Sequence, residues 1–500
     1  MSRPDVIIVG SGLGGATMAA SLAPSGRNIL IFERGERLTP SPRDRDETAI
    51  FRDGVFRPDE WWADGSGALF NPGNYYCVGG NSKFFGGVML RYRAEDFTPI
   101  RHIGGTTPGW PIGYDDLEPW YTQAEALYQV RGGPPGEDPT EPRHSGPYPF
   151  PPVPDEPVIA DLRRRLAGVG LHPAALPLGV DPGRWLAGGQ TPWDAFPGTC
   201  GGKMDAETVG IAKALSYPNV RLKTGTPVIR LHADETGRIS KVETRTGPRN
   251  RTFSAPVVVL AAGAVQTAAL LLRSANADHP AGLANASGQV GRNFMCHNTS
   301  AVLALHPLRR NPSVYQKTLM FNDFYLGGGP GGAPLGNVQL LGKISGPILS
   351  ANAPFPAPVA RWVAHRSVDF YAMSEDLPTP ESRVTIKDGQ IVLDWKRSNQ
   401  KTHRALVARL RQVLRRAGFP IVLSKRFDRR TPSHQCGTAR MGHDARTSVV
   451  DTFCRSHDHP NLFITDASVL PTSAAVNPAL TIAALSLRAG NRILQGGVPE

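Results

Sequence analysis

The clearest hydrophobic pattern of the chain lies at its beginning, where three runs follow one another. Residues 5–9 are a β-branched run, DVIIV, and residues 28–35, NILIFERG, are a second apolar run. Between them, residues 10–26 carry apolar side chains at helical spacing after a cluster of glycines. Short β-branched runs favour strands, and apolar residues three or four positions apart favour a helix. The order predicts strand, glycine turn, helix and strand, as expected of an α/β protein.

Four later segments also have clear patterns. Residues 255–272, APVVVLAAGAVQTAALLL, predict strand, turn and helix. Residues 300–307 and 337–344 predict single strands, and residues 382–395 predict a hairpin with Asp-Gly at its turn. The Pro- and Gly-rich residues 132–157 and 327–359 predict loop-rich excursions between these elements.

Composition places the chain among ordinary globular proteins. It has 500 residues, of which 40% are hydrophobic and 20% charged, enough for a large core and several structural units. Five scattered cysteines without a CxxC pair argue against a disulfide framework or a structural zinc site, so no metal is expected. The first strand begins almost at once, leaving no room for a signal peptide, and the apolar run 255–272 is broken by Gly263. We therefore expect a cytoplasmic protein without a membrane segment.

The net charge of +12 does not by itself indicate a nucleic-acid partner. The densest basic stretch, residues 404–430, lies partly on an amphipathic helix whose apolar face includes Leu406 and Leu410. No aromatic residues alternate with these arginines. We interpret the stretch as a solvated helix face and expect no nucleic-acid partner.

The glycines after the first strand form a dinucleotide-binding motif. Gly10, Gly12 and Gly15 make G-x-G-x-x-G, where the first allows a tight turn, the second lets backbone approach a pyrophosphate, and the third lets helix and strand pack. Phosphates then sit at a helix N-terminus, where free N–H groups favour anions. Glu33 ends the second strand and can accept hydrogen bonds from ribose hydroxyls. One such motif leaves NAD and FAD both open.

The sequence resembles the glucose–methanol–choline (GMC) family of FAD-dependent oxidoreductases along most of its length. The resemblance is carried by the N-terminal motif, by residues 77–93, CVGGNSKFFGGVMLRYR, by the strand and helix within 255–272, by residues 290–298, VGRNFMCHN, and by residues 434–488. Within the family, the sequence looks most like the bacterial branch of pyranose oxidases and C-glycoside 3-oxidases.

The resemblance implies FAD as the cofactor. The loop 79–87 contains no histidine of the kind that some family members link covalently to FAD, so we expect non-covalent FAD. Phe85 stands where many members have asparagine, and Cys296 replaces an aspartate without an evident reason. The implied FAD-binding residues are Gly10, Gly12, Leu13, Gly14, Gly15, Glu33, Arg34, Gly79, Gly80, Asn81, Ser82, Phe85, Gly86, Val228, Ala262, Gly263, Asp466, Ala467, Asn477, Pro478 and Ala479.

The resemblance also implies the catalytic residues. His434, in HQCGT, matches the family's active-site base, and Asn477, in AAVNPALT, matches the partner that holds the substrate oxygen. An imidazole suits the role because its pKa lies near neutral pH. Asn477 followed by Pro478 also fits the start of a helix, with the asparagine as its cap. We expect His297 to pack or hydrogen-bond near the FAD domain, without a catalytic role.

These implications give an expected function and its alternatives. We expect oxidation of a secondary ring hydroxyl of a sugar or glycoside to a ketone, with electrons passed to O2 or a quinone. The alternatives are an aryl, aliphatic or steroid alcohol as substrate, a non-redox lyase that keeps FAD, and a binding protein. Trp61, Trp62, Tyr75 and Tyr76 could stack on a sugar or an aromatic aglycone, or could pack in the core. Oligomeric state is not predicted.

The expected architecture is an α/β protein with a discontinuous Rossmann-like FAD-binding domain and an α+β substrate-binding domain. The first would comprise residues 1–100, 205–298 and 433–500. The second would comprise residues 101–204 and 299–432, with a mixed or antiparallel sheet above the flavin.

Overall fold

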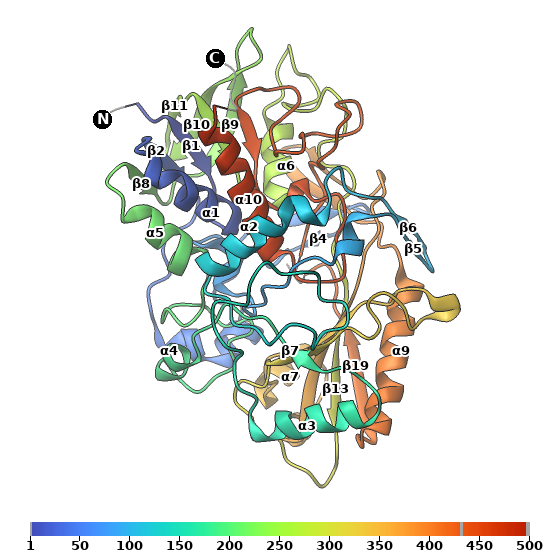
Figure 1. Ribbon diagram of the computed structural model, residues 1–500. Coiled ribbons are helices and arrows are strands. Elements are labelled where there is room, and N and C mark those ends of the chain that lie inside the picture. The colour runs from blue at the N-terminus through green and yellow to red at the C-terminus, as the bar shows by residue number, and fades with distance from the viewer. Residues whose placement is uncertain (1–2, 431–433, 497–500) are drawn as a thin grey trace.

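The computed structural model describes residues 3–430 and 434–496 and contains two main sheets, a parallel one and an antiparallel one (Figure 1). The expected boundary between residues 432 and 433 lies outside the described residues. The parallel sheet has the order β20-β12-β1-β2-β8, and its strands lie far apart in sequence. They are β20 (Leu462–Ile464), β12 (Val257–Leu260), β1 (Val6–Val9), β2 (Ile29–Phe32) and β8 (Val220–Lys223).

The N-terminal prediction of strand, glycine turn, helix and strand is confirmed. Helix α1 (Leu13–Leu22) connects β1 to β2, and it packs against the last helix, α10 (Ala479–Leu494). All residues of β1 and β2 are buried. Such short, wholly apolar strands are typical of a parallel sheet covered on both faces. The predicted strand, turn and helix within 255–272 are β12 and α6 (Ala264–Arg273).

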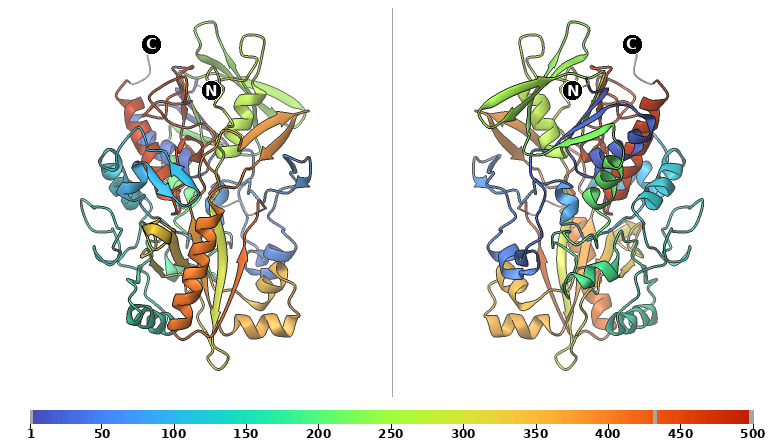
Figure 2. Two further views of the ribbon diagram at one scale, coloured as in Figure 1. Left: turned by 90° about the vertical axis from the view of Figure 1, so that its right-hand side faces the viewer. Right: turned by 90° about the vertical axis from the view of Figure 1, so that its left-hand side faces the viewer.

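The second large sheet has six strands in the order β19-β13-β16-β15-β14-β7, and each pair is antiparallel. Helices α3 (Pro157–Gly168) and α9 (Gln400–Arg416) cover one of its faces, and α9 runs alongside its long strands (Figure 2). The strands are β19 (Ile421–Arg426), β13 (Asn298–Leu305), β16 (Ser367–Ser374), β15 (Asn337–Leu340), β14 (Leu319–Phe321) and β7 (Ala174–Ala175).

Strand β13 shows how this sheet separates a core from a cavity. Val302 and Ala304 pack beneath α3 and α9, whereas Ala301 and Leu303 point to the opposite face and line a cavity. Side chains alternate between faces along a strand, so one apolar run serves both purposes. The prediction of a strand over 300–307 is confirmed by β13.

The strand predicted over 337–344 is shorter in the structure, because β15 ends at Leu340. The amide of Leu341 still donates to the Asp369 carbonyl oxygen, but the amide of Gly342 donates to the Asp194 carboxylate instead (3.1 Å). A side chain from a distant loop therefore ends the strand.

The predicted hairpin is confirmed as β17 and β18, which form part of a four-stranded sheet of order β17-β18-β3-β4. Its turn residues Asp388 and Gly389 both have positive φ angles, 51° and 77°, as a tight two-residue hairpin requires. Two further small sheets, β11-β10-β9 and β5-β6, complete the strands. The bounds are β17 (Arg383–Lys387), β18 (Gln390–Asp394), β3 (Trp62–Asp64), β4 (Leu69–Phe70), β9 (Val228–Ala233), β10 (Ile239–Thr246), β11 (Arg249–Phe253), β5 (Ile100–His102) and β6 (Gly105–Thr107).

The remaining α-helices are α2 (Tyr114–Leu127), α4 (Pro182–Ala187), α5 (Ala212–Leu215), α7 (Gly346–Asn352) and α8 (Ala357–Ala364). Within residues 3–430 and 434–496, the helices are all too short or too polar to cross a membrane. The five cysteines, all within this described part, are thiols rather than disulfides.

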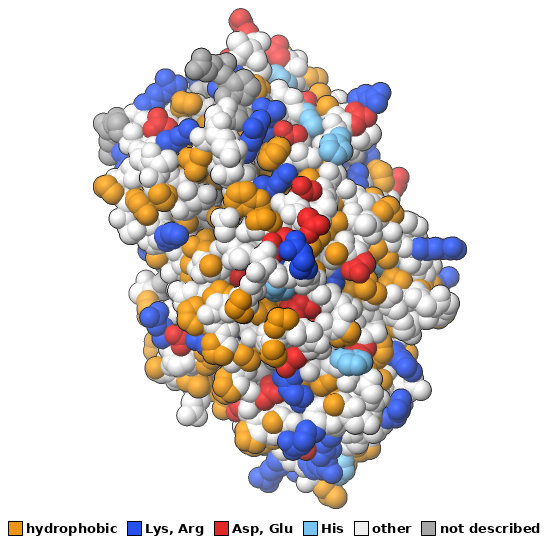
Figure 3. All heavy atoms as spheres, viewed as in Figure 1, with side chains coloured by type: hydrophobic (Ala, Val, Ile, Leu, Met, Phe, Trp, Pro, Cys, Tyr) orange, Lys and Arg blue, Asp and Glu red, His pale blue; other side chains and the backbone are white. Residues whose placement is uncertain are grey.

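Helix α9 has the amphipathic character that its sequence predicts. Leu406 and Leu410 are fully buried against the sheet. Arg404, Arg415 and Arg416 are exposed. Basic side chains gather at the lower end of the molecule, where α3 and α9 lie (Figure 3).

Candidate active site

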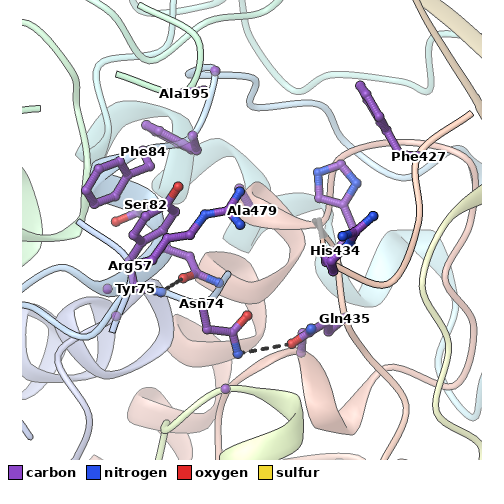
Figure 4. A pocket seen from close by; sticks show the side chains of 18 of the residues that line it. Arg57, Asn74, Tyr75, Ser82, Phe84, Ala195, Phe427, His434, Gln435 and Ala479 are labelled. Atoms are coloured by element: carbon purple, nitrogen blue, oxygen red, sulfur yellow. Dashed lines mark hydrogen bonds between the residues drawn. The ribbon is translucent and has the colours of Figure 1, made fainter. Parts of the chain in front are cut away.

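A cavity of about 1430 Å³ lies between the two main sheets. Its floor includes the carboxyl ends of β1, β2 and β12 together with the N-terminus of α1, and its roof includes β13, β16 and β19. Figure 4 shows His434 and Phe427 on one side of the cavity, with Tyr75 and Phe84 on the other. Ligands of open parallel sheets bind outside the carboxyl ends of the strands, so the fold puts the cavity where a cofactor is expected.

The glycines after β1 fall into two groups by what surrounds them. A Cβ added at Gly14 would collide with the carbonyl oxygen of Thr465, and one added at Gly15 with that of Gly10. Gly10 has a φ of +101°. In contrast, a Cβ added at Gly12 would meet no described atom within 4 Å. Three glycines thus allow packing, and Gly12 leaves open space at the start of α1.

Glu33 lies at the end of β2, on the wall of the cavity. Its Oε2 accepts hydrogen bonds from the amide (3.0 Å) and hydroxyl (2.7 Å) of Ser11, and its Oε1 accepts from the Gly35 amide (3.0 Å). Burial raises the pKa of the carboxyl, while these hydrogen bonds act in the opposite direction. The carboxylate is therefore held in one orientation beside the start of α1.

The loop around residues 79–87 is anchored from behind by Lys203, which sequence reasoning missed. The Lys203 ammonium is wholly buried and donates to the carbonyl oxygens of Phe85 (2.7 Å) and Phe196 (2.5 Å). Burial lowers its pKa to about 7. In front, the Ser82 hydroxyl donates to the Gly79 carbonyl oxygen at 2.6 Å. The loop can therefore present its backbone to the cavity with little movement.

Asp466 connects the end of β20 to the start of α6. Its Oδ2 accepts hydrogen bonds from the Gly263 amide (3.0 Å) and the Thr267 hydroxyl (2.6 Å). Of the residues that the sequence predicts to bind the cofactor, all except Gly15 and Gly79 line the cavity. Gly15 packs beneath Gly10, and the Gly79 amide donates to the Ser11 hydroxyl.

His434 and Asn477 meet at the cavity wall. The Nε2 of His434 lies 3.2 Å from the Nδ2 of Asn477, and both side chains are partly exposed to the cavity. The Asn477 Oδ1 accepts from the Nε2 of Gln339 at 2.8 Å. Because an amide nitrogen only donates, Asn477 points its donor toward an acceptor nitrogen of His434. The predicted cap is wrong: α10 has Pro478 at its N-cap without a side-chain cap bond, and the Asn477 side chain is used at the site instead.

A line of buried amides sets the orientation of Asn477. Each member donates to the oxygen of the next, and the line ends at a carboxylate that can only accept. Its members are Gln339, Asn337, Asn322 and Asp138, and Asp138 is paired with Arg93. The sequence carries a signal of this line, since Asn337 and Gln339 alternate with apolar residues in NVQL and so share one face of β15.

His297 lies directly behind His434. The two Nδ1 atoms are 2.8 Å apart, and the His297 Nε2 is 2.7 Å from the carbonyl oxygen of Ser473. The pKa of His434 is lowered well below its usual value, first by loss of hydration and then by His297 and Lys317. Burial also lowers the pKa of His297. Both imidazoles are therefore neutral at pH 7, which leaves a lone pair on His434 free to take a proton.

The roof of the cavity is mainly apolar. Ala301, Leu303, Tyr371 and Phe427 line it. The charged Lys317 is neutralised by Asp194 at 2.7 Å. This wall suits an uncharged substrate or an uncharged part of one.

The four aromatic residues considered in the sequence have different positions. Trp62 is 1% exposed and belongs to the core, whereas Trp61 is 53% exposed on the surface. Tyr75 and Tyr76 line the cavity, with Tyr75 stacked on Phe84. Trp62 is therefore a packing residue of the core, whereas Tyr75 and Tyr76 are placed where they can contact a ligand in the cavity.

The cavity fits an elongated dinucleotide cofactor. It extends continuously from Glu33 and the open space at Gly12 to His434, past the backbone of the loop around Gly80. The Oδ1 of Asn74, which lies on this wall, is buried and has no hydrogen-bond partner among the described residues. A ligand donor at this point would satisfy that oxygen.

Comparisons with known proteins agree with this geometry. Two models described as GMC oxidoreductase match residues 193–299 and 378–486, and a model of an NAD(P)-binding Rossmann-like domain matches residues 8–62. The chain is 30% identical to a paromamine 6'-oxidase of Streptomyces fradiae, over 98% of this chain and 91% of the relative. It is 27% identical to a 2-methyl-1,2-propanediol dehydrogenase of Mycolicibacterium austroafricanum, over 98% and 95%. The crystal structure of pyridoxine 4-oxidase from Mesorbium loti has a TM-score of 0.68 at 20% identity, over 99% of each chain, and shows the same fold.

Proposed function

Because the chain belongs to the GMC oxidoreductase family, we propose that it oxidises a secondary ring hydroxyl of a sugar or glycoside to a ketone, with His434 as the base. The family and the Rossmann-like domain imply FAD as the cofactor. The observation that carries the proposal is the convergence of the His434 Nε2 acceptor and the Asn477 Nδ2 donor on one cavity wall.

The two side chains have complementary roles toward an alcohol. A substrate hydroxyl that enters between them can accept from the Asn477 amide and donate its proton to His434 Nε2. As the proton leaves, the amide stabilises the negative charge that develops on the oxygen. Bound FAD supplies the acceptor for the hydride that leaves the carbinol carbon.

Similarity and the aromatic lining of the cavity both support a sugar-like substrate. The similarity to a paromamine 6'-oxidase supports a hydroxyl on an aminoglycoside or related sugar. Tyr75, Tyr371 and Phe427 line the cavity and can contact the apolar face of a sugar ring or an aglycone.

An aryl or aliphatic alcohol is the second candidate substrate. The apolar roof around Leu303 and Phe427 favours it, as does the similarity to a diol dehydrogenase.

We propose O2 or a quinone as the final electron acceptor and non-covalent attachment of FAD. Acid precipitation of the protein tests the attachment, because non-covalent flavin stays in the supernatant.

The proposed function is tested by mixing FAD-loaded protein with candidate alcohols under nitrogen. Bleaching of the flavin by monosaccharides or glycosides, with formation of the ketone, supports the proposal. Bleaching by aryl or aliphatic alcohols alone favours the second candidate. Absence of bleaching by any alcohol contradicts alcohol oxidation. Readmitting air then distinguishes O2 from another acceptor by the rate of reoxidation.

Replacing Asn477 with alanine should lower kcat/KM by about 10- to 100-fold, because a hydrogen bond to a developing charge contributes about 1.5–3 kcal/mol. The measurement is steady-state kinetics at pH 8 with the best alcohol substrate. Asn477→Asp is the matched variant, since it keeps the size but removes the donor, and it should not restore the rate. A wild-type kcat/KM in Asn477→Ala would contradict the assigned role.

The rate of flavin reduction should remain high as the pH falls to 6.5 and decline only below it. The base acts when unprotonated, and the lowered pKa of His434 moves its protonation to more acidic pH. His297, Asn477 and Lys317 are the neighbours that face it. Lys317→Met removes a cation, so its acid limb should lie at higher pH than that of the wild type. A pH–rate profile measured by stopped flow checks both, and an acid limb above pH 6.5 in the wild type would contradict the expectation.

A further inference from the structure

We infer that His297 is a positioning residue that holds His434 in the tautomer with a free Nε2 lone pair. The inference rests on the proposed function, and it adds a positioning role to the expectation that His297 packs or hydrogen-bonds near the FAD domain without a catalytic role. It follows from the directions of three hydrogen bonds.

The first hydrogen bond fixes His297. Its Nε2 lies 2.7 Å from the Ser473 carbonyl oxygen, which can only accept, so this nitrogen carries the hydrogen. The Nδ1 of a neutral His297 is then a lone pair. Burial lowers the pKa of His297, which keeps it neutral.

The second hydrogen bond determines which nitrogen of His434 carries the hydrogen. The His297 Nδ1 lone pair faces the His434 Nδ1 at 2.8 Å, so the hydrogen between them belongs to His434. A neutral imidazole has one N–H, and His434 Nε2 is therefore unprotonated. The third bond agrees independently, because Asn477 Nδ2 can only donate and points at that Nε2.

The series of hydrogen bonds from His297 to His434 starts at the Ser473 carbonyl, and this carbonyl is held in place. Its oxygen also accepts from the Tyr92 hydroxyl at 3.1 Å. The Ser473 hydroxyl donates to the Asp376 carbonyl oxygen and accepts from the Asp376 amide, at 3.0 and 3.1 Å. The orientation of His297 therefore does not depend on a flexible segment.

The pair also limits how many protons the site can hold. When the alcohol gives its hydroxyl proton to His434 Nε2, the resulting cation still donates from Nδ1 to neutral His297. A second proton would place positive charges on two rings whose Nδ1 atoms lie 2.8 Å apart, beside Lys317, with Glu375 as the opposing charge that acts on His297. The pair accepts one proton, the number released by one alcohol oxidation.

Two variants of His297 test the inference by kinetics. His297→Leu removes the acceptor, so both tautomers of His434 become accessible, and flavin reduction should slow by about 10- to 100-fold, short of the ~10⁴-fold loss when a wrong tautomer is enforced. The acid limb of its pH profile should also move. His297→Asn offers Oδ1 as an acceptor near the position of Nδ1 and should recover most of the loss. Equal loss in both variants with an unchanged acid limb would indicate a structural role and overturn the inference.

The tautomer can be observed directly, without turnover. In the FAD-bound wild type at pH 8, ¹⁵N-histidine NMR should show His434 protonated at Nδ1 and unprotonated at Nε2, with the signals assigned by loss in His434→Asn. A protonated His434 Nε2 would overturn the inference even if the enzyme oxidises alcohols. Failure of every alcohol to bleach the flavin would overturn the proposed function instead, while leaving the NMR result meaningful.

Discussion

Replacing His434 with alanine should slow flavin reduction by an alcohol about 10²- to 10⁴-fold while FAD stays bound. A positioned general base contributes a factor of this size, and the site has no second lone pair placed like that of His434 Nε2 among the described residues. His434 contacts His297 through Nδ1 and faces Asn477 through Nε2, so its replacement should lower the rate of the chemical step rather than the binding of FAD. Stopped-flow absorbance under nitrogen measures the rate, and the flavin spectrum of the purified variant measures FAD content.

A matched control is available in the same part of the chain. His443 is exposed and nine residues from His434, so His443→Ala should reduce the flavin at the wild-type rate. If His434→Ala retains the wild-type rate, the base lies elsewhere. If instead the variant loses FAD, the residue supports the cofactor rather than the reaction.

Replacing Gly12 should prevent FAD binding and leave the fold intact, whereas replacing the nearby Gly14 should prevent folding. Gly12→Val should give a folded protein that lacks FAD, because a Cβ at this position meets no described atom within 4 Å and the larger side chain would extend into the open space at the start of α1. Gly12 has a φ of −65°, which valine can adopt. Gly14→Ala should fail to fold to the native state, because its Cβ would collide with the Thr465 carbonyl oxygen in the sheet core.

The comparison needs two measurements on each variant. Circular dichroism with thermal unfolding reports the fold, and the absorbance near 450 nm of the purified protein reports bound flavin. Gly168→Ala and Gly168→Val are suitable controls for surface glycine replacement, since Gly168 is exposed, has no left-handed φ, and leaves an added Cβ free of contacts within 4 Å. A Gly12→Val protein that retains full FAD would contradict the assignment of this space to the cofactor.

The sequence predicts well those features that depend on neighbouring residues. The β-branched runs around Gly10, the Asp388–Gly389 turn and the apolar stripe of α9 each appear as expected, because local geometry and burial on one face determine them. The family resemblance added the pairing of His434 with Asn477 across 43 residues, which no local pattern contains.

The features that the sequence did not predict depend on contacts between distant segments. β15 ends early because the Gly342 amide donates to Asp194, and Asn477 leaves the helix cap because Gln339 binds its oxygen. His297 precedes His434 by 137 residues, and the tautomer depends on a carbonyl 176 residues after it. Such pairings follow from the topology of the sheets rather than from spacing along the chain.

The strand order of the parallel sheet has a consequence for biosynthesis. β1 leaves the ribosome some 250 residues before its sheet neighbour β12, and β20 and α10, the helix that packs on α1, follow later still. Contacts this distant in sequence form slowly, and incomplete sheets expose apolar edges. The nascent chain therefore exposes an incomplete apolar sheet until β12, β20 and α10 have been made, and the cavity bordered by these elements is complete only after that point.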